Sequence, residues 1–117
     1  MRYLLLIYEN EKAWMSIPED QQGAIFGEYM AFTESITKSG NMIAGDPLQP
    51  TETATTVRVR EGKRLVTYGP FAETREQLGG YYMIEAKDLD EAIAIAERIP
   101  SARMGSIEIR PVMEIPA

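Results

Sequence analysis

The sequence contains no cysteine and no histidine among its 117 residues. Without cysteine, the chain can form no disulfide, no thiolate nucleophile and no cysteine metal site. Without histidine, it lacks the commonest general base near neutral pH and the commonest metal ligand. Any acid–base role therefore falls to a carboxylate, tyrosine, lysine or arginine whose pKa its surroundings displace. We expect no metal and no cofactor.

Basic residues are few: 12 Lys and Arg stand against 18 Asp and Glu, a net charge of −6. Nucleic acids and anionic membranes bind basic surfaces, so neither is expected as a partner. Long apolar runs are also lacking, because the stretch at residues 4–8 is too short for a membrane span or a signal peptide. We expect a cytoplasmic protein with a single domain, residues 1–117.

Apolar spacing predicts two helices. The first spans residues 18–39, after a capping box formed by Ser16 and Glu19. Asp88 caps the second helix and Pro100 ends it. The first helix has an apolar stripe of Ile25, Tyr29, Phe32 and Ile36, widened by Phe26 and Met30, and the second has Leu89, Ile93 and Ala96 at helical spacing.

Apolar runs and turn residues predict the strands. They lie at residues 3–8, within 41–49, at 80–86 and at 106–112, with a hairpin of 56–60 and 64–68 around Glu61-Gly62-Lys63. The order βαβ, hairpin, βαβ predicts an α+β, ferredoxin-like sandwich, in which two helices cover one face of an antiparallel sheet.

The first strand is apolar on both faces: Leu4, Leu6 and Tyr8 share one parity, and the residues between them share the other. Two helices can cover only one face, so the other would expose an apolar patch. A two-fold homodimer packed sheet on sheet resolves this. The alternative is a monomer whose free face is covered by the loops at 51–55 and 71–78.

Four segments in order carry a family resemblance: residues 1–8, 54–58, 69–76 (GPFAETRE) and 108–112. They resemble the DGPF-type branch of the YCII-related family. The resemblance implies a dimeric α+β barrel whose two sheets enclose a cavity, and it suggests an association with a sigma factor. Tyr68 stands where the family signature has aspartate. If that aspartate carries chemistry in relatives, this chain has lost it; if it only caps the turn, little changes.

Strand parity suggests an anion site. If Val57 and Val59 face the helices, Arg58 faces the barrel interior, where Arg110 on the last strand would join it. Tyr81 and Tyr68 complete the predicted ligand-binding set. The alternative is that the two arginines pair with carboxylates in a polar interface: Glu73, Glu85 or Glu108.

Glu73 is a candidate general base, provided that burial raises its pKa; otherwise its segment is a solvated turn. Two functions stay open. One is a dimeric module, binding or regulatory, with a small-molecule cavity between its sheets. The other is a cofactor-free lyase, isomerase or hydrolase acting on a small anionic or aromatic metabolite, by analogy with relatives that act on aromatic rings. The sequence does not decide whether the protein is an enzyme.

Overall fold

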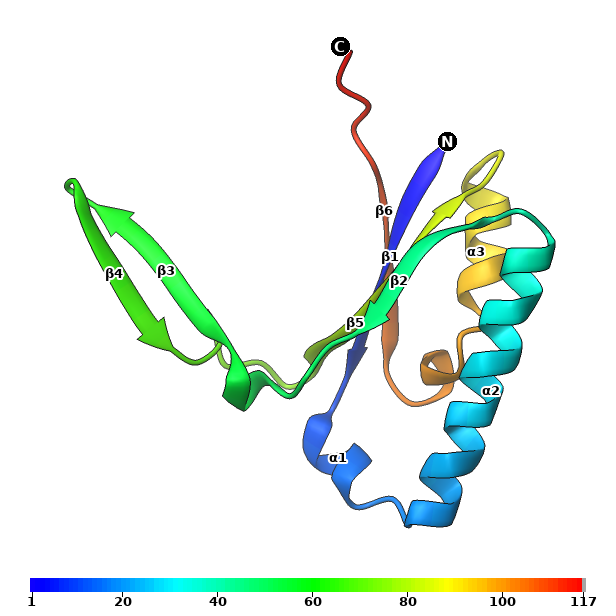
Figure 1. Ribbon diagram of the computed structural model, residues 1–117, viewed down its shortest axis with the longest axis horizontal. Coiled ribbons are helices and arrows are strands. Elements are labelled where there is room, and N and C mark those ends of the chain that lie inside the picture. The colour runs from blue at the N-terminus through cyan, green and yellow to red at the C-terminus, as the bar shows by residue number, and fades with distance from the viewer. Residues whose placement is uncertain (117) are drawn as a thin grey trace.

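The main sheet contains four antiparallel strands in the order β2-β5-β1-β6. The computed structural model describes residues 1–116. The strands are β1 (Arg2–Glu9), β2 (Met42–Pro47), β5 (Gln77–Glu85) and β6 (Ser106–Pro111). Two helices, α2 (Glu19–Lys38) and α3 (Leu89–Ala96), cover one face of the sheet (Figure 1). This order is that of a ferredoxin-like α+β sandwich, so the predicted fold class is confirmed.

The core lies between the sheet and the two helices. Alternate residues of β1 point into it, so that Tyr3, Leu5 and Ile7 are buried. They pack with residues of β5 and of both helices in one cluster, which includes Ile84, Phe32, Ile36 and Ile95. The intervening residues of β1, Leu4, Leu6 and Tyr8, lie on the opposite face and are only half-buried. The free face of the sheet is therefore apolar along its central strand.

Helix α2 begins and ends within one residue of its predicted bounds. Phe32 and Ile36 of its apolar stripe are buried as expected. Two predictions about this helix are wrong. Phe26 and Met30 do not widen the buried stripe, because they are 56% and 74% exposed. The capping box does not form, since Pro18 is the N-cap.

Helix α3 has the predicted cap: the Asp88 carboxylate accepts a hydrogen bond from the Glu91 backbone amide at 2.9 Å. Of the three residues predicted for its apolar face, only Ala96 is buried. Ala92, Ile95 and Ala96 face the core, whereas Leu89 and Ile93 are about half exposed.

Strands β3 (Thr55–Arg60) and β4 (Lys63–Tyr68) form a separate two-stranded ribbon, which we call the hairpin. Glu61 and Gly62 form a two-residue turn, and both have positive φ, as a type I′ turn requires. Figure 1 shows the hairpin standing away from the main sheet, on the side opposite the helices. The premise that Val57 and Val59 face the helices is therefore wrong, because these side chains are 59% and 62% exposed.

Three short elements complete the chain: α1 (Glu11–Met15), η1 (Thr51–Thr53) and η2 (Pro100–Arg103). Helix α1 lies in a segment predicted to be a loop. Its N-cap is Asn10, whose side chain accepts a hydrogen bond from the Ala13 amide at 3.0 Å. Within residues 1–116, none of the helices has the length and apolarity needed to cross a bilayer.

Candidate functional site

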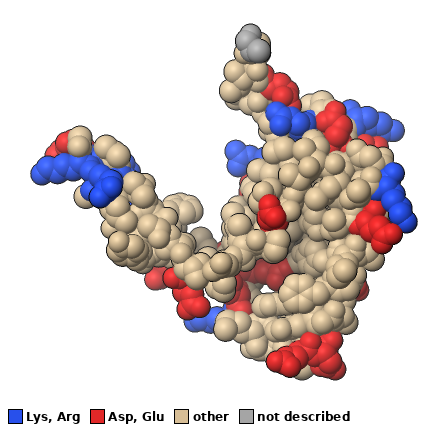
Figure 2. Space-filling view, viewed as in Figure 1, with Lys and Arg blue, Asp and Glu red and all other residues tan. Residues whose placement is uncertain are grey.

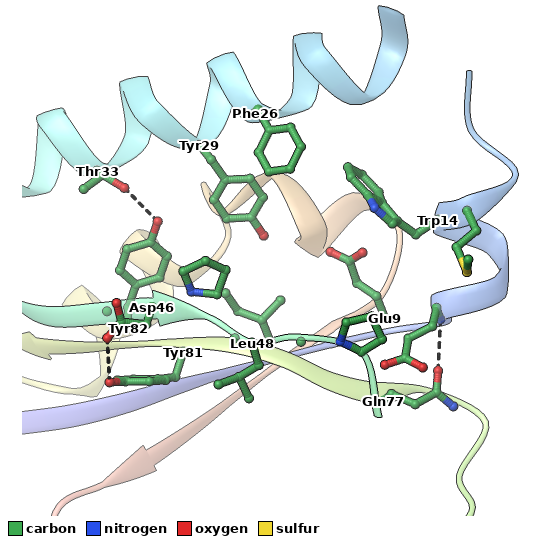
Figure 3. Close-up of a pocket in the computed structure, with 18 of the residues that line it drawn as sticks. Glu9, Trp14, Phe26, Tyr29, Thr33, Asp46, Leu48, Gln77, Tyr81 and Tyr82 are labelled. Atoms are coloured by element: carbon green, nitrogen blue, oxygen red, sulfur yellow. Dashed lines mark hydrogen bonds between the residues drawn. The ribbon is translucent and has the colours of Figure 1, made fainter. Parts of the chain in front are cut away.

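A pocket of about 480 Å³ opens between helices α1 and α2 and one end of the main sheet (Figure 3). This volume suits a small organic ligand, since such sites typically measure some 300–1,000 Å³. Its wall is mainly apolar and aromatic, with contributions from β1, α1, α2, β5 and the segment from β2 to η1. The lining residues are Ile7, Glu9, Glu11, Trp14, Met15, Phe26, Tyr29, Thr33, Met42, Gly45, Asp46, Pro47, Leu48, Pro50, Gln77, Gly79, Gly80, Tyr81 and Tyr82.

Helix α1 is held against the pocket by hydrogen bonds at its first residue, Glu11. The Glu11 carboxylate accepts from the Thr51 amide and from the Thr51 hydroxyl, both at 2.8 Å. The Glu11 amide donates to the side-chain oxygen of Gln77 at 2.9 Å. One end of the pocket is thus closed by contacts among α1, η1 and the start of β5.

Aromatic side chains line the helical side of the pocket. The rings of Trp14 and Phe26 meet edge to face, with centroids 5.8 Å apart. The Phe26 ring faces the pocket and not the core, which accounts for part of its exposed surface. Deeper in, the Tyr82 hydroxyl is 2.7 Å from the Thr33 hydroxyl, which satisfies both polar groups. Flat apolar rings of this kind favour a ligand that is itself flat.

A chain of three polar side chains adjoins this apolar wall: Glu9, Ser101 and Tyr29, which we call the polar centre. Ser101 has no exposed surface, and its hydroxyl donates a hydrogen bond to Glu9 Oε1. The Tyr29 hydroxyl bonds to Ser101 Oγ. Because serine has a single hydroxyl hydrogen, which Ser101 donates to Glu9, Tyr29 is the donor to Ser101. Figure 3 shows Glu9 and Tyr29 extending toward one another within the pocket.

Burial shifts the titration of both ends of this chain. The pKa of Glu9 is raised, first by loss of hydration and then by the negative charge of Glu76. Burial also raises the pKa of Tyr29 to about 12. Both shifts favour the neutral form, so the polar centre holds protons more firmly than the same groups do in water. A carboxyl group with a raised pKa at a pocket wall is a candidate for proton exchange with a ligand.

Gly45 sets the width of the pocket beside Tyr82. A Cβ atom at this position would lie 2.7 Å from Tyr82 Cδ1. Real Cβ atoms do not approach so closely, so any side chain at this position would displace the Tyr82 ring. Glycine therefore keeps the Thr33–Tyr82 hydrogen bond and the wall behind it in place.

The structure distributes the predicted site residues over several places. Tyr81, on β5, borders the pocket through its strand, but it pairs with Leu6, so its ring lies on the free face of the sheet, where its hydroxyl donates a hydrogen bond to Asp46 Oδ2 at 3.1 Å. Arg58 and Tyr68 lie on the hairpin, where Tyr68 is 87% exposed. Arg110 lies on β6, at the free face of the sheet.

Arg110 and Tyr81 thus share the free face, whereas Arg58 lies apart on the hairpin, so the predicted set is not brought together within the protomer described over residues 1–116. Arg110 Nη1 lies 3.8 Å from Glu108 Oε2, which agrees with the alternative that Arg110 pairs with a carboxylate. Arg58 donates to the Phe71 carbonyl at 3.3 Å. Glu73 is exposed, so the burial on which its role as a base was conditional is absent from the protomer. Whether any of these residues binds a ligand stays a prediction.

Sequence reasoning missed the polar centre. Glu9 follows directly on the apolar run of β1, and a carboxylate that continues a buried strand is a usable signal. Tyr29 was predicted only as part of an apolar stripe. Ser101 carries no sequence signal, since its burial follows from the packing of η2. As for metals, no three Asp or Glu side chains gather in a potential ion site anywhere in residues 1–116.

Comparison with known proteins adds three findings. The model of the family described as the YCII-related domain matches residues 1–116. An uncharacterised protein of Rhizobium meliloti (strain 1021) is 33% identical over 114 residues, which are 96% of this chain and 92% of that protein. A solved structure of similar fold is 5-chloro-2-hydroxyhydroquinone dehydrochlorinase from Burkholderia phenoliruptrix, in complex with 2,5-dihydroxybenzoquinone. Its TM-score is 0.51 and its identity 15%, over 97% of this chain and 94% of that chain.

Proposed function

We propose that this chain, which belongs to the YCII-related domain family, binds a small, uncharged, ring-shaped organic molecule in the pocket beneath α2. The observation that carries the proposal is the pocket itself: about 480 Å³ in volume, with aromatic walls and the polar centre at its side. Binding sites of this type are mostly apolar, with a few polar groups that orient the ligand.

The charge of the lining favours an uncharged ligand. Two carboxylates, Glu9 and Glu11, contribute to the wall, and none of the described lining residues is lysine or arginine. An anionic ligand would meet repulsion and find no opposite charge. The proposal thus keeps the aromatic ligand class expected from the sequence and replaces the anionic one. It also places the ligand on the helix side of the sheet instead of between two sheets.

The flat walls support a ring as the ligand. Trp14, Phe26 and Tyr82 present aromatic faces or edges, and the hydroxyl and carboxyl groups of Tyr29 and Glu9 would pair with hydroxyl groups on such a ring. The dehydrochlorinase of similar fold is described in complex with 2,5-dihydroxybenzoquinone, a hydroxylated ring compound. This supports the ligand class and carries no residue role across, because at 15% identity only the fold is comparable.

A second candidate function is proton-transfer catalysis, favoured by the raised pKa of Glu9. A ring compound that carries a carbonyl group would give the proton of an adjacent carbon to the Glu9 carboxylate. The same proton would then return to the carbonyl oxygen, so that the keto form becomes the enol. The reaction needs no cofactor and leaves the composition of the substrate unchanged.

Titration with hydroquinone tests the binding proposal. Trp14 is the single tryptophan of the chain and lies in the pocket wall, so its fluorescence reports occupancy. Isothermal titration calorimetry gives the affinity independently. We expect saturable binding of hydroquinone and much weaker binding of benzoate, a ring of similar size with a negative charge.

Phe26→Ala should weaken hydroquinone binding, whereas Phe71→Ala, which removes an exposed ring outside the pocket, should not. Two results would refute the proposal: no saturable heat with hydroquinone, or equal binding of benzoate.

We also propose that the protein is a homodimer whose free sheet faces pack together. The support is the apolar strip of Leu4, Leu6 and Met83 on that face, which neither helix covers. Leu6→Arg should yield monomers in size-exclusion chromatography with light scattering. Ile93→Arg, on the exposed side of α3, makes the same kind of change away from this face and should leave the dimer intact. A dimer that survives Leu6→Arg would contradict the proposed interface.

A further inference from the structure

The hairpin exposes apolar side chains that its own chain does not cover. Val57 pairs with Val66 across the two strands, and both share a face with Val59. These three side chains are 41–62% exposed, and Phe71 at the root of the hairpin is also exposed. A two-stranded ribbon without a third strand or a packing partner is marginally stable in water. The hairpin therefore requires a surface to pack against.

The dimensions of the molecule also indicate that a large surface is left uncovered. Its Cα radius of gyration is 16.3 Å, whereas a compact chain of this length should measure about 13 Å. Its accessible surface is 8442 Å², while a compact monomer of 13.2 kDa should expose about 6,400 Å². The excess of roughly 2,000 Å² exceeds the roughly 800 Å² that each partner buries in a standard interface. Figure 2 shows the molecule hollowed between the hairpin and the body.

Charge identifies the kind of surface that fits. The hairpin carries four basic residues, Arg58, Arg60, Lys63 and Arg64, and one acidic residue, Glu61, so its net charge is +3. Because the whole chain has a net charge of −6, the remainder carries −9. Figure 2 shows the basic side chains gathered toward the tip of the hairpin. A basic, partly apolar arm is complementary to an acidic body such as that of this same chain.

We propose that the hairpin is a clasp: its Val57, Val59 and Val66 face packs on the body of a second copy of this chain. The inference rests on the homodimer proposed above and adds a second contact to it. In a two-fold dimer each copy gives one hairpin and receives one, so both apolar faces are buried and opposite charges meet twice. The hollow between hairpin and body is then the place that the partner fills.

Two charge-matched variants test the clasp. Val57→Lys with Val59→Lys places two charges on the apolar face of the hairpin. Leu65→Lys with Thr67→Lys places two on the opposite face, since these residues alternate with Val66 along β4. Analytical ultracentrifugation over a dilution series gives the dimer dissociation constant. We expect the first variant to raise it by about tenfold or more and the second to change it much less.

The absence of cysteine permits a direct test of contact. The Val59→Cys variant is labelled with a benzophenone maleimide and mixed with unlabelled chain enriched in ¹⁵N. After irradiation, the isotope content of the crosslinked peptides shows whether the label reached its own chain or the other copy. We expect crosslinks from the hairpin of one copy to the body of the other, outside residues 55–68.

The outcomes separate the clasp from the dimer. The clasp would be overturned, and the sheet-face dimer retained, if Val57→Lys with Val59→Lys left the dimer dissociation constant unchanged. Crosslinks confined to one chain would have the same meaning. A wild-type protein that is monomeric at all concentrations would overturn both, and would assign the hairpin to a different partner.

Discussion

Ser101 and Glu9 are 92 positions apart in the chain and share a hydrogen bond beside the pocket. Glu9 ends the central strand of the sheet, and Ser101 lies in the short helix that follows α3. The bond fixes one oxygen of the carboxylate and leaves the group at the pocket wall, where burial raises its pKa. The main fold thus delivers an oriented carboxyl group to a mainly apolar cavity.

Ser101→Ala should lower the free energy of unfolding by about 1–3 kcal/mol, because it leaves buried polar groups of Glu9 and Tyr29 without their partner. Urea unfolding measures the loss. Ser106→Ala is the control: it removes an exposed hydroxyl that bonds to Glu76 and should stay within about 0.5 kcal/mol of wild type. Equal effects of the two substitutions would show that the polar centre adds nothing to stability.

Glu9 should make the protein less stable as the pH rises. Its pKa is higher in the folded state than in the unfolded state, so the unfolded chain releases the proton first. The free energy of unfolding therefore falls as the pH rises from the pKa of Glu9 in the unfolded chain through its pKa in the folded protein. Below both pKa values, Glu9 is protonated in both states and its titration does not change stability.

Glu9→Gln removes this titration. The stability of the variant relative to wild type should therefore be greater at neutral pH than at about pH 4. Glu73→Gln, at an exposed position, controls for the change in net charge. A difference between variant and wild type that does not depend on pH would contradict the raised pKa.

Two glycine substitutions should act in opposite directions. Gly45→Ala forces the Tyr82 ring aside and should cost about 1–3 kcal/mol, as overpacking does. It should also weaken hydroquinone binding, since both residues line the pocket. Gly23→Ala lies in α2 with nothing within 4 Å of the new methyl group and should stabilise by about 0.5–1 kcal/mol. Thermal melts of both variants check the signs.

Asp88→Ala should lower stability by about 1 kcal/mol, because it removes the side chain that accepts from the Glu91 amide at the start of α3. Asp88→Asn retains a capping oxygen and should cost little. Chemical denaturation of the two variants provides the measurement. Similar losses in both would indicate that the charge of Asp88, rather than its cap, is what matters.

The main sandwich could be predicted because its signals are local. The two-sided apolarity of β1 and the 3.6-residue stripe of α2 are each visible within one segment, and the structure contains both. The orientation of the hairpin could not be predicted this way. Alternation of Val57, Arg58 and Val59 looks the same whether a strand joins the sheet or leaves it. The chain leaves the main sheet after Leu48, whose amide still donates to the Gly79 carbonyl, and Pro50, just before η1, lacks the N–H that a further ladder hydrogen bond would need.

The candidate site was harder to predict than the fold, because it depends on contacts between distant segments. Tyr81 was predicted as a ligand-binding residue; its strand borders the pocket, while its ring lies on the free face of the sheet. The arginine cluster rested on the premise that Val57 and Val59 face the helices; that premise is wrong, and whether the arginines bind a ligand stays a prediction. Glu9, Tyr29 and Ser101 come together only once β1, α2 and η2 are packed, and no spacing in the sequence records that distance.

Helix α1 should open more readily than the sheet beside it. It has five residues, none of them buried, and Glu11 ties it down through hydrogen bonds to Thr51 and Gln77. Segments with so little buried surface unfold locally at a small fraction of the global free energy. Its amide hydrogens should therefore exchange with solvent sooner than those of β1 beside it. A bound ligand would slow that exchange, which makes α1 the natural kinetic reporter of occupancy.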